Sequence, residues 1–201
     1  MAATRDETTR VPVAVLGATG YTGVELLRLL ARHPAVEIAF VSSEQYRGRR
    51  ASEVYPSLAG VVESTLRAPE PDDVAGAADV VFTALPHGAT APLVRALLAR
   101  GLRVIDLSAD FRLHDPAVYG RWYGAHEAPE LLSEAVYGVP EFYRGRIRGA
   151  RLVANPGCYP TGALLGLVPL ARAGLLHEPV TIDAKSGTTG AGRGAKVEQL
   201  F

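Results

Sequence analysis

The stretch VPVAVLGATGYTGVELLRLLARHP, residues 11–34, joins an apolar run, a glycine-rich turn and an amphipathic segment. The run 11–17 is continuously apolar, as is typical of a strand buried on both faces of a parallel sheet. In the segment 21–34 apolar residues recur every three to four positions, which predicts a helix, and Pro34 closes it. The stretch therefore predicts a strand, a tight turn and a helix in succession.

The turn between them, GATGYTG, places three glycines at intervals of three residues. A turn in this position points backbone N–H groups and a helix N-terminus at one spot, which favours a phosphate anion. Glycine also lets a pyrophosphate approach the backbone closely, whereas glycines that serve packing alone are the alternative. The expected cofactor-binding residues of this turn are Gly17, Thr19, Gly20, Tyr21, Thr22 and Gly23.

The rest of the chain repeats the alternation of strand and helix. Strands are expected at 36–43, 78–86, 102–109, 150–157 and 179–187, and helices at 89–101 and 159–176. Residues 111–150 break this rhythm and are expected to form an irregular excursion. The pattern predicts an α/β fold, a Rossmann-like parallel sheet with helices on both faces.

The end of the second strand indicates which dinucleotide is bound. NAD sites usually place an acidic residue there for the ribose 2′-OH. Here the strand ends in Ser42 and Ser43, and Arg47 and two further arginines follow shortly after it. Serine and arginine side chains suit the 2′-phosphate of NADP. Glu44 argues the other way, and a solvated loop is the alternative interpretation of the arginines.

Cys158 is the only cysteine, and it lies in the crowded turn NPGCYPTG between a strand and a helix. A thiolate at a helix N-terminus is stabilised by free N–H groups and by the helix dipole. Gly157 permits a sharp turn, and Asn155 can hydrogen-bond across it. We interpret Cys158 as a nucleophile at the carboxyl edge of the sheet, although most lone cysteines are small buried hydrophobes.

Composition excludes several classes of protein. Lysine plus arginine and aspartate plus glutamate both number 21, so no net charge gathers nucleic acid or an anionic membrane. No apolar stretch approaches the roughly 18 residues of a membrane span, and one cysteine gives no internal disulfide. No histidine, cysteine and carboxylate cluster has metal-ligand spacing. A cytoplasmic protein without a metal is expected.

A second glycine run, residues 187–194, invites comparison with the phosphate-binding loop of kinases and ATPases. That loop requires lysine and a hydroxyl residue directly after its second glycine. Here Arg193 and Gly194 follow Gly192, so both groups are missing. ATP-dependent phosphoryl transfer is therefore disfavoured.

Six motifs together resemble the N-acetyl-gamma-glutamyl-phosphate reductase family, which is related to aspartate-semialdehyde dehydrogenases. They are GATGYTG (17–23), LPHG (85–88), DLSADFRL (106–113), YGVPE (137–141), NPGCYPTG (155–162) and KSGTTGAGR (185–193). The resemblance implies NADPH-dependent reduction of an acyl phosphate to a semialdehyde through a thioester, within arginine biosynthesis. The implied roles are Cys158 as the catalytic nucleophile, Arg112 and Asn155 as substrate-binding residues, and Leu85, Pro86, His87, Ser186 and Gly187 as cofactor-binding residues.

The resemblance also implies a division of the chain. The polar composition of residues 1–10 predicts a tail. The resemblance implies an NADP-binding domain at 11–157 and the start of a substrate domain at 158–201. The family's catalytic histidine lies in a motif downstream of residue 201, and none of the five histidines here matches it. A homo-oligomer is implied for the full-length protein. A reductase of N-acetyl-aminoadipyl phosphate and a non-catalytic NADP-binding fragment are the alternatives.

Overall fold

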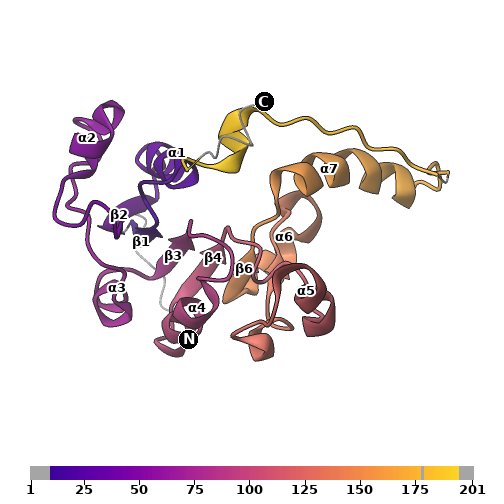
Figure 1. Cartoon of the computed structure of the whole chain (residues 1–201), viewed down its shortest axis with the longest axis horizontal. Coiled ribbons are helices and arrows are strands. Elements are labelled where there is room, and N and C mark those ends of the chain that lie inside the picture. Colours follow the sequence, from indigo (N-terminus) through magenta and orange to yellow (C-terminus); the bar gives the residue numbers. More distant parts are fainter. Residues whose placement is uncertain (1–9, 178, 195–201) are drawn as a thin grey trace.

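The computed structural model describes residues 10–177 and 179–194 (Figure 1). Residues 1–9 of the expected tail and 195–201 of the expected second domain lie outside the described residues. The strands are β1 (Val11–Leu16), β2 (Val36–Val41), β3 (Val80–Thr83), β4 (Arg103–Asp106), β5 (Val136–Tyr137) and β6 (Leu152–Ala154). The α-helices are α1 (Tyr21–Leu30), α2 (Ala51–Val54), α3 (Pro71–Ala77), α4 (Ala91–Ala99), α5 (Pro116–Tyr123), α6 (Pro140–Gly149) and α7 (Cys158–Arg172). Short 3₁₀ turns are η1 (Pro56–Leu58), η2 (Pro129–Leu131) and η3 (Thr188–Ala191).

The six strands form one parallel sheet in the order β2-β1-β3-β4-β6-β5. After β1 the chain moves outward to β2, and it returns to the other side of β1 with β3. The strand order therefore reverses between β1 and β3. In open α/β sheets, ligands bind outside the carboxyl ends of the strands at this reversal.

Alternate residues of β1 pack into different cores. Ala14 and Leu16 belong to the cluster under α3 and α4, and Val15 belongs to the cluster under α1 and α2. Successive side chains of a strand point to opposite faces, so the two clusters cover the two sides of the sheet. This arrangement explains the uninterrupted apolar run of the first strand, and it confirms the expected fold class.

The segment 111–150 is more regular than the sequence predicted. It contains helices α5 and α6 and the two-residue strand β5, which extends the sheet beyond β6. Asp115 caps α5 by accepting hydrogen bonds from the amides of Ala117 and Val118. The prediction of an irregular excursion was wrong because two short helices rich in Tyr, Gly and Arg give no clear apolar period.

The strand expected at 179–187 is also absent from the structure, since the described part of this segment has no strand pairing. Val180 is 40% exposed and Ile182 is 59% exposed, so neither side chain meets a core. A strand needs a neighbour for its N–H and C=O groups, and no neighbouring strand lies beside this segment in the described residues. In Figure 1 it runs as an extended connection from α7 back toward α1.

No helix within residues 10–177 and 179–194 has the length and apolar character needed to cross a membrane.

Candidate active site at the carboxyl edge of the sheet

The three glycines of the first turn meet different surroundings. A Cβ on Gly17, whose φ is +80°, would lie 2.3 Å from the carbonyl oxygen of Ala84. A Cβ on Gly23 would lie 2.2 Å from the carbonyl oxygen of Gly17. The nearest atom to a Cβ on Gly20, the N-cap of α1, would be 3.6 Å away, an ordinary contact. Packing therefore explains two of the glycines and leaves the third, next to the helix N-terminus, free for the approach of a ligand.

Ser42 and Ser43 are both buried against the glycine turn. The Ser42 hydroxyl accepts a 3.2 Å hydrogen bond from the amide of Gly17. The Ser43 hydroxyl lies 2.8 Å from that of Thr19 and accepts a 3.3 Å hydrogen bond from the amide of Tyr46. In this structure the two serines fix the shape of the turn.

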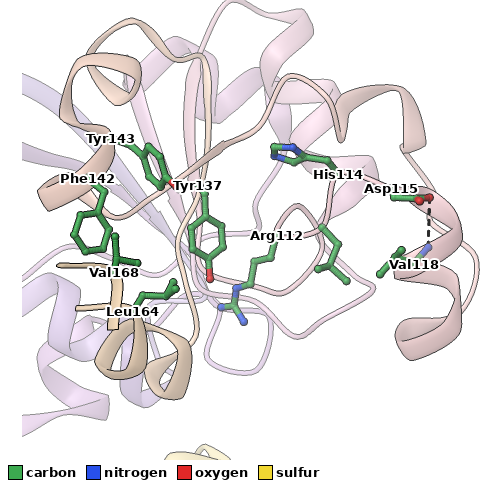
Figure 2. A pocket seen from close by; sticks show the side chains of 10 residues that line it. Arg112, His114, Asp115, Val118, Tyr137, Phe142, Tyr143, Leu164 and Val168 are labelled. Atoms are coloured by element: carbon green, nitrogen blue, oxygen red, sulfur yellow. Dashed lines mark hydrogen bonds between the residues drawn. The ribbon is translucent and has the colours of Figure 1, made fainter. Parts of the chain in front are cut away.

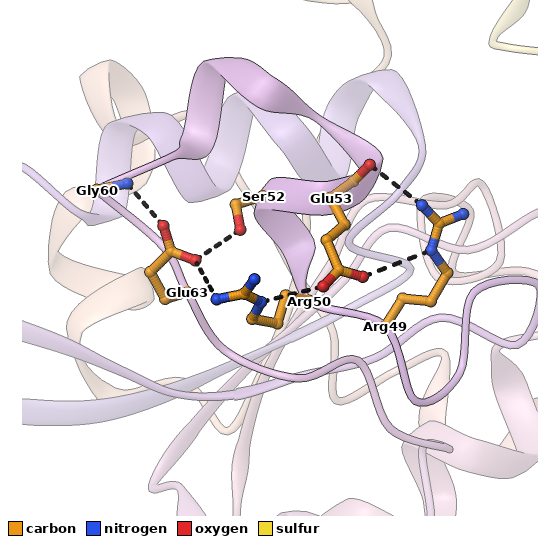
Figure 3. Close-up of polar contacts among 6 residues, drawn as sticks. All are labelled: Arg49, Arg50, Ser52, Glu53, Gly60 and Glu63. Carbon is orange, nitrogen blue, oxygen red and sulfur yellow. Dashed lines mark hydrogen bonds and ion pairs between the residues drawn. The ribbon is translucent and has the colours of Figure 1, made fainter.

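The arginines after β2 differ in their partners, as Figure 3 shows. Arg49 lies 3.7 Å and Arg50 lies 3.1 Å from the Glu53 carboxylate, and Arg50 also lies 3.8 Å from Glu63. Arg47 is exposed and has no carboxylate partner among the described residues. Arg47 is therefore the arginine of this loop whose positive charge is available to a ligand.

Arg193 reaches the glycine turn from the far end of the chain. Its Nη1 donates a 3.3 Å hydrogen bond to the carbonyl of Thr19, which also accepts one from the Tyr55 hydroxyl at 2.9 Å. The guanidinium carbon lies 5.2 Å from the ring centre of Tyr46 and 5.1 Å from that of Tyr55. No role was expected for Arg193, although its position after a glycine run was a usable signal.

The loop after β3 lies beside the glycine turn, since Leu85 would contact a Cβ on Gly17. Pro86 and His87 are exposed in this loop. His87 Nδ1 accepts a 2.9 Å hydrogen bond from the amide of Ala109, so the proton of the neutral ring belongs on Nε2.

A buried network that contains two carboxylates joins this loop to the one after β4. Asp110 accepts from the Gly88 amide at 2.7 Å, and from the Thr90 hydroxyl at 2.6 Å. Although burial opposes it, the sum of such hydrogen bonds lowers the pKa of Asp110. Burial raises the pKa of Asp106, and the hydroxyl groups of Thr83 and Ser108 offset this only in part. This network was not expected, because single Ser and Thr residues carry no distinctive sequence pattern.

Cys158 is exposed and begins α7, with Gly157 as the N-cap. Arg112 stabilises the preceding turn, because its Nε donates a 2.8 Å hydrogen bond to the Asn155 carbonyl. A Cβ on Gly157 would lie 3.2 Å from Arg112 Nη1, a tight contact that would require the guanidinium to shift by a few tenths of an ångström. The Asn155 amide nitrogen donates to the carbonyl of Pro156 at 3.1 Å. The two residues expected to bind substrate therefore also build the turn that presents the thiol.

Cys158 lines a cavity of about 340 Å³ together with Ser186 and Gly187. The other lining residues are Tyr159, Thr188, Gly190 and Ala191. The structure thus brings the expected nucleophile together with the residues expected at the reactive end of the cofactor, although they lie 28 positions or more apart in the sequence.

A second cavity, of about 410 Å³, is lined by Arg112 and by residues of α7 (Figure 2). Arg112 and Tyr137 are among its polar residues, and the Tyr137 hydroxyl points toward the Arg112 guanidinium. Its walls are Leu113, His114, Asp115, Val118, Phe142, Tyr143, Leu164 and Val168. Arg112 therefore connects the turn that carries the thiol to a largely apolar cavity.

None of the five histidines lines the Cys158 cavity. His126 donates through Nε2 to the Asp110 carbonyl at 2.8 Å and accepts the Ala128 amide at 2.9 Å, so both ring nitrogens serve the fold. His114 lies 3.1 Å from the Ala135 carbonyl.

The order of the strands, the glycine turn at the strand reversal and the exposed thiol at the same edge define an α/β dinucleotide-binding domain of the dehydrogenase type. Comparison with protein families makes this specific. Residues 12–150 match the family described as semialdehyde dehydrogenase, NAD binding domain, and residues 158–201 match the semialdehyde dehydrogenase dimerisation domain. The chain belongs to the semialdehyde dehydrogenase family.

Curated relatives are similar over nearly the whole chain. N-acetyl-gamma-glutamyl-phosphate reductase of Citrifermentans bemidjiense is 52% identical over 192 residues, which cover 95% of this chain and 56% of that protein. The enzymes of the same name from Halorhodospira halophila and Azotobacter vinelandii are 54% and 55% identical over 193 and 191 residues, again covering 56% of their own length. The chain therefore spans about half of the length of these relatives.

Solved structures share the fold at low sequence identity. Aspartate semialdehyde dehydrogenase with NADP from Candida albicans superposes with a TM-score of 0.61 at 18% identity, covering 84% of this chain and 48% of that one. Aspartate semialdehyde dehydrogenase II from Vibrio cholerae, complexed with ASA, has a TM-score of 0.59 at 21% identity, covering 82% and 47%.

Proposed function

We propose that this chain supplies the NADP(H) site and the cysteine nucleophile of an N-acetyl-gamma-glutamyl-phosphate reductase, an enzyme of arginine biosynthesis. The observation that carries the proposal is the cavity shared by Cys158 with Ser186 and Gly187, at the same sheet edge as the glycine turn. The relatives that match 95% of the chain bear this enzyme name. A cytoplasmic location and a homo-oligomer, through the part of the chain that matches a dimerisation domain, belong to the same proposal.

The residues present fit a dinucleotide phosphate. Gly20 leaves room at the N-terminus of α1, where backbone N–H groups attract a pyrophosphate. Arg47 has no carboxylate partner among the described residues, and a free guanidinium suits the 2′-phosphate of NADP. Thr19, Tyr21 and Thr22 flank the turn, and Leu85, Pro86 and His87 continue its surface from the neighbouring loop. When bound, NADPH supplies the hydride of the reaction.

Cys158 performs the covalent step. Its Sγ attacks the acyl carbon, the bond from that carbon to the phosphate oxygen breaks, and inorganic phosphate leaves, which produces a thioester. Hydride addition to the thioester carbon and cleavage of its C–S bond release the semialdehyde, and the sulfur takes up one proton, in place of the one it lost before its attack, to restore the thiol. Arg112 holds the turn through the Asn155 carbonyl, and its Nη1 lies beside Gly157, where it can attract the phosphate or carboxylate of the substrate.

A reductase of N-acetyl-aminoadipyl phosphate is the second candidate, since its substrate differs by one methylene. One methylene contributes only about 1–3 kcal/mol to discrimination in a pocket. The names of the relatives favour the glutamyl substrate. A non-catalytic NADP-binding module would keep the cofactor site and leave Cys158 unreactive.

The acylation half of the reaction tests the proposal directly. The purified protein is mixed with N-acetyl-gamma-glutamyl phosphate without cofactor, and its intact mass is measured. We expect one acyl group per chain and one equivalent of released phosphate, neither of which forms with Cys158→Ser. A separate titration of NADPH fluorescence should show binding to both proteins.

Each outcome has a defined meaning. Absence of acylation with intact NADPH binding would support the non-catalytic module. Equal acylation by the glutamyl and aminoadipyl compounds would contradict the proposal that the glutamyl compound is the preferred substrate. Acylation that persists in Cys158→Ser would overturn the role of the thiol.

A further inference from the structure

Between the loops after β3 and β4 lies a row of five buried oxygen-bearing side chains. The members in spatial order are Thr83, Asp106, Ser108, Thr90 and Asp110, and every one is at most 1% exposed. Thr83 and Asp106 are register partners at the ends of adjacent strands. The row therefore runs from the last sheet position into the loop that carries His87.

Four short oxygen contacts connect the row. They are Thr83 Oγ1 to Asp106 Oδ1 at 2.6 Å, Asp106 Oδ2 to Ser108 Oγ at 2.6 Å, Ser108 Oγ to Thr90 Oγ1 at 2.9 Å, and Thr90 Oγ1 to Asp110 Oδ2 at 2.6 Å. Each contact at such a distance requires one hydrogen between the two oxygens. The three hydroxyl groups supply three hydrogens for four contacts. One further proton must therefore reside on a carboxyl group of the row.

The surroundings of the two carboxyl groups decide which one holds this proton. Besides the Thr90 hydroxyl, Asp110 accepts from the amides of Gly88 and Thr90 and from the Tyr119 hydroxyl, at 2.7, 3.2 and 3.1 Å. A backbone amide N–H can only donate a hydrogen bond, so the oxygen that it faces must be an acceptor. Asp106 instead meets two hydroxyl groups and a single amide, that of Ser108, and the Ser108 hydroxyl also accepts the Asp110 amide at 3.0 Å. A hydroxyl can accept as readily as it donates, so Asp106 can carry the proton and give it to Ser108.

We infer that Asp106 and Asp110 hold a single proton between them through Ser108 and Thr90, with Asp106 neutral and Asp110 anionic. We further infer that Asp110 is a positioning residue for the loop that presents His87. Ser108 then donates to Thr90, and Thr90 donates to Asp110, so every oxygen in the row is satisfied. The opposite pKa directions of the two groups agree with this arrangement. The importance of the loop for cofactor binding rests on the proposed function, whereas the place of the proton does not.

The place of the proton is measured on the wild-type protein without cofactor. Selective ¹³C labelling of aspartate side-chain carboxyl carbons distinguishes a carboxylic acid from a carboxylate by chemical shift, and backbone connectivity assigns the signals. At pH 7 we expect the acid shift for Asp106 and the carboxylate shift for Asp110. Two carboxylate shifts, or the acid shift on Asp110, would overturn the inference.

Amide variants of the two aspartates form a matched pair. In Asp106→Asn the new N–H donates to Ser108 as the protonated carboxyl did, so NADPH affinity should stay within about threefold of wild type. In Asp110→Asn the new NH₂ group faces N–H and O–H donors and cannot accept their hydrogen bonds. The Gly88 and Thr90 amides should therefore exchange hydrogen at least about tenfold faster than in wild type, and NADPH should bind about tenfold more weakly. Equal losses in both variants would contradict the assignment.

A second pair of variants, at Thr90, tests the same inference in case the aspartate variants misfold. Thr90→Val keeps the shape and removes the hydroxyl, and Thr90→Ser keeps the hydroxyl and removes a methyl group. The inference expects faster exchange of the Gly88 amide in the valine variant and near wild-type exchange in the serine variant. The reverse ranking would mean that Thr90 only fills space and would overturn the positioning role. Because exchange is measured without cofactor, failure of NADPH binding in the wild type would count against the proposed function alone.

Discussion

The guanidinium of Arg112 donates a 2.8 Å hydrogen bond to the backbone carbonyl of Asn155, three residues before the exposed Cys158. A second bond, also 2.8 Å, goes from Arg112 to the carbonyl of Leu107 in the loop after β4. One side chain thus ties together the loop after β4 and the turn after β6. The turn that carries the thiol is therefore bonded to a residue that was expected to bind the substrate.

We therefore predict that Arg112→Ala disorders the cysteine turn. Hydrogen bonds to charged groups contribute about 1.5–3 kcal/mol each, so the acylation rate should fall roughly tenfold to a hundredfold. Arg112→Lys should recover little, because an ammonium cannot bond two carbonyls with the geometry of the planar guanidinium. Acylation followed by intact mass, together with the thermal midpoint, measures both effects.

Arg95→Ala provides the control for this prediction. Arg95 also donates to a backbone carbonyl, that of Glu127, and pairs with Glu130, but it lies on the outer surface of α4. Its loss should leave acylation unchanged. A similar fall in both variants would show that general loosening, rather than the cysteine turn, controls the reaction.

The glycine turn gives a prediction in which two similar substitutions separate folding from binding. Gly17→Ala combines a left-handed backbone with a Cβ only 2.3 Å from the Ala84 carbonyl, which should cost about 2–4 kcal/mol of unfolding free energy. Gly20→Ala has an ordinary φ of −76° and open surroundings, so the fold should persist. If a pyrophosphate approaches Gly20, its alanine variant should bind NADPH about tenfold more weakly.

Urea unfolding and NADPH fluorescence measure these two effects. Gly76→Ala, inside α3 with nothing near its added Cβ, should leave both quantities unchanged or raise stability slightly. If Gly20→Ala binds NADPH as tightly as wild type, the glycine turn is not part of the phosphate-binding site.

The arginines after β2 allow a test of cofactor choice. Arg47→Ala should weaken NADPH binding about tenfold, equivalent to about 1.4 kcal/mol, and leave NADH binding unchanged, because only NADPH carries the 2′-phosphate. Arg50→Ala is the control, since Arg50 already pairs with Glu53 and Glu63. Isothermal titration with both cofactors gives the four affinities, and a parallel loss for NADH would argue against a contact with the 2′-phosphate.

Residue pattern predicted the parts of this molecule that follow from local periodicity. The first strand, the glycine turn and the helix at 21–34 were expected, because a buried parallel strand and an amphipathic helix leave clear marks in the sequence. The expected strand at 179–187 depended on a pairing partner elsewhere in the chain, so its apolar residues alone could not establish it. The helices between 111 and 150 were missed because few apolar side chains mark their faces.

The candidate site shows the same division. Cys158 and the glycines could be named because a lone cysteine in a tight turn and evenly spaced glycines are unusual. Arg193 could not be placed at Thr19, since the contact joins segments 174 positions apart. The proton shared by Asp106 and Asp110 depends on distances between hydroxyl groups of separate loops, which only the folded chain defines.

Tyr119 provides the prediction for alkaline pH. It is 2% exposed, and its hydroxyl donates to Asp110 at 3.1 Å. Burial, followed by the negative charge of Asp110, raises the pKa of Tyr119 to about 12 from the ordinary 10.0. Since the folded pKa exceeds the unfolded one, the stabilisation is complete below pH 10 and is lost as pH rises toward 12. Each pKa unit corresponds to about 1.4 kcal/mol, so the unfolding free energy should fall by about 2–3 kcal/mol across this interval.

Tyr119→Phe should lack this loss, because it has no hydroxyl group to ionise. The variant should be less stable than wild type at pH 8, by about 1 kcal/mol for the lost hydrogen bond, and the difference should shrink or reverse near pH 12. Urea unfolding at matched pH values measures the difference between the two proteins, which cancels the titration of all other groups. Parallel stability curves for wild type and Tyr119→Phe from pH 9 to 12 would show that Asp110 does not hold the tyrosine in its protonated form.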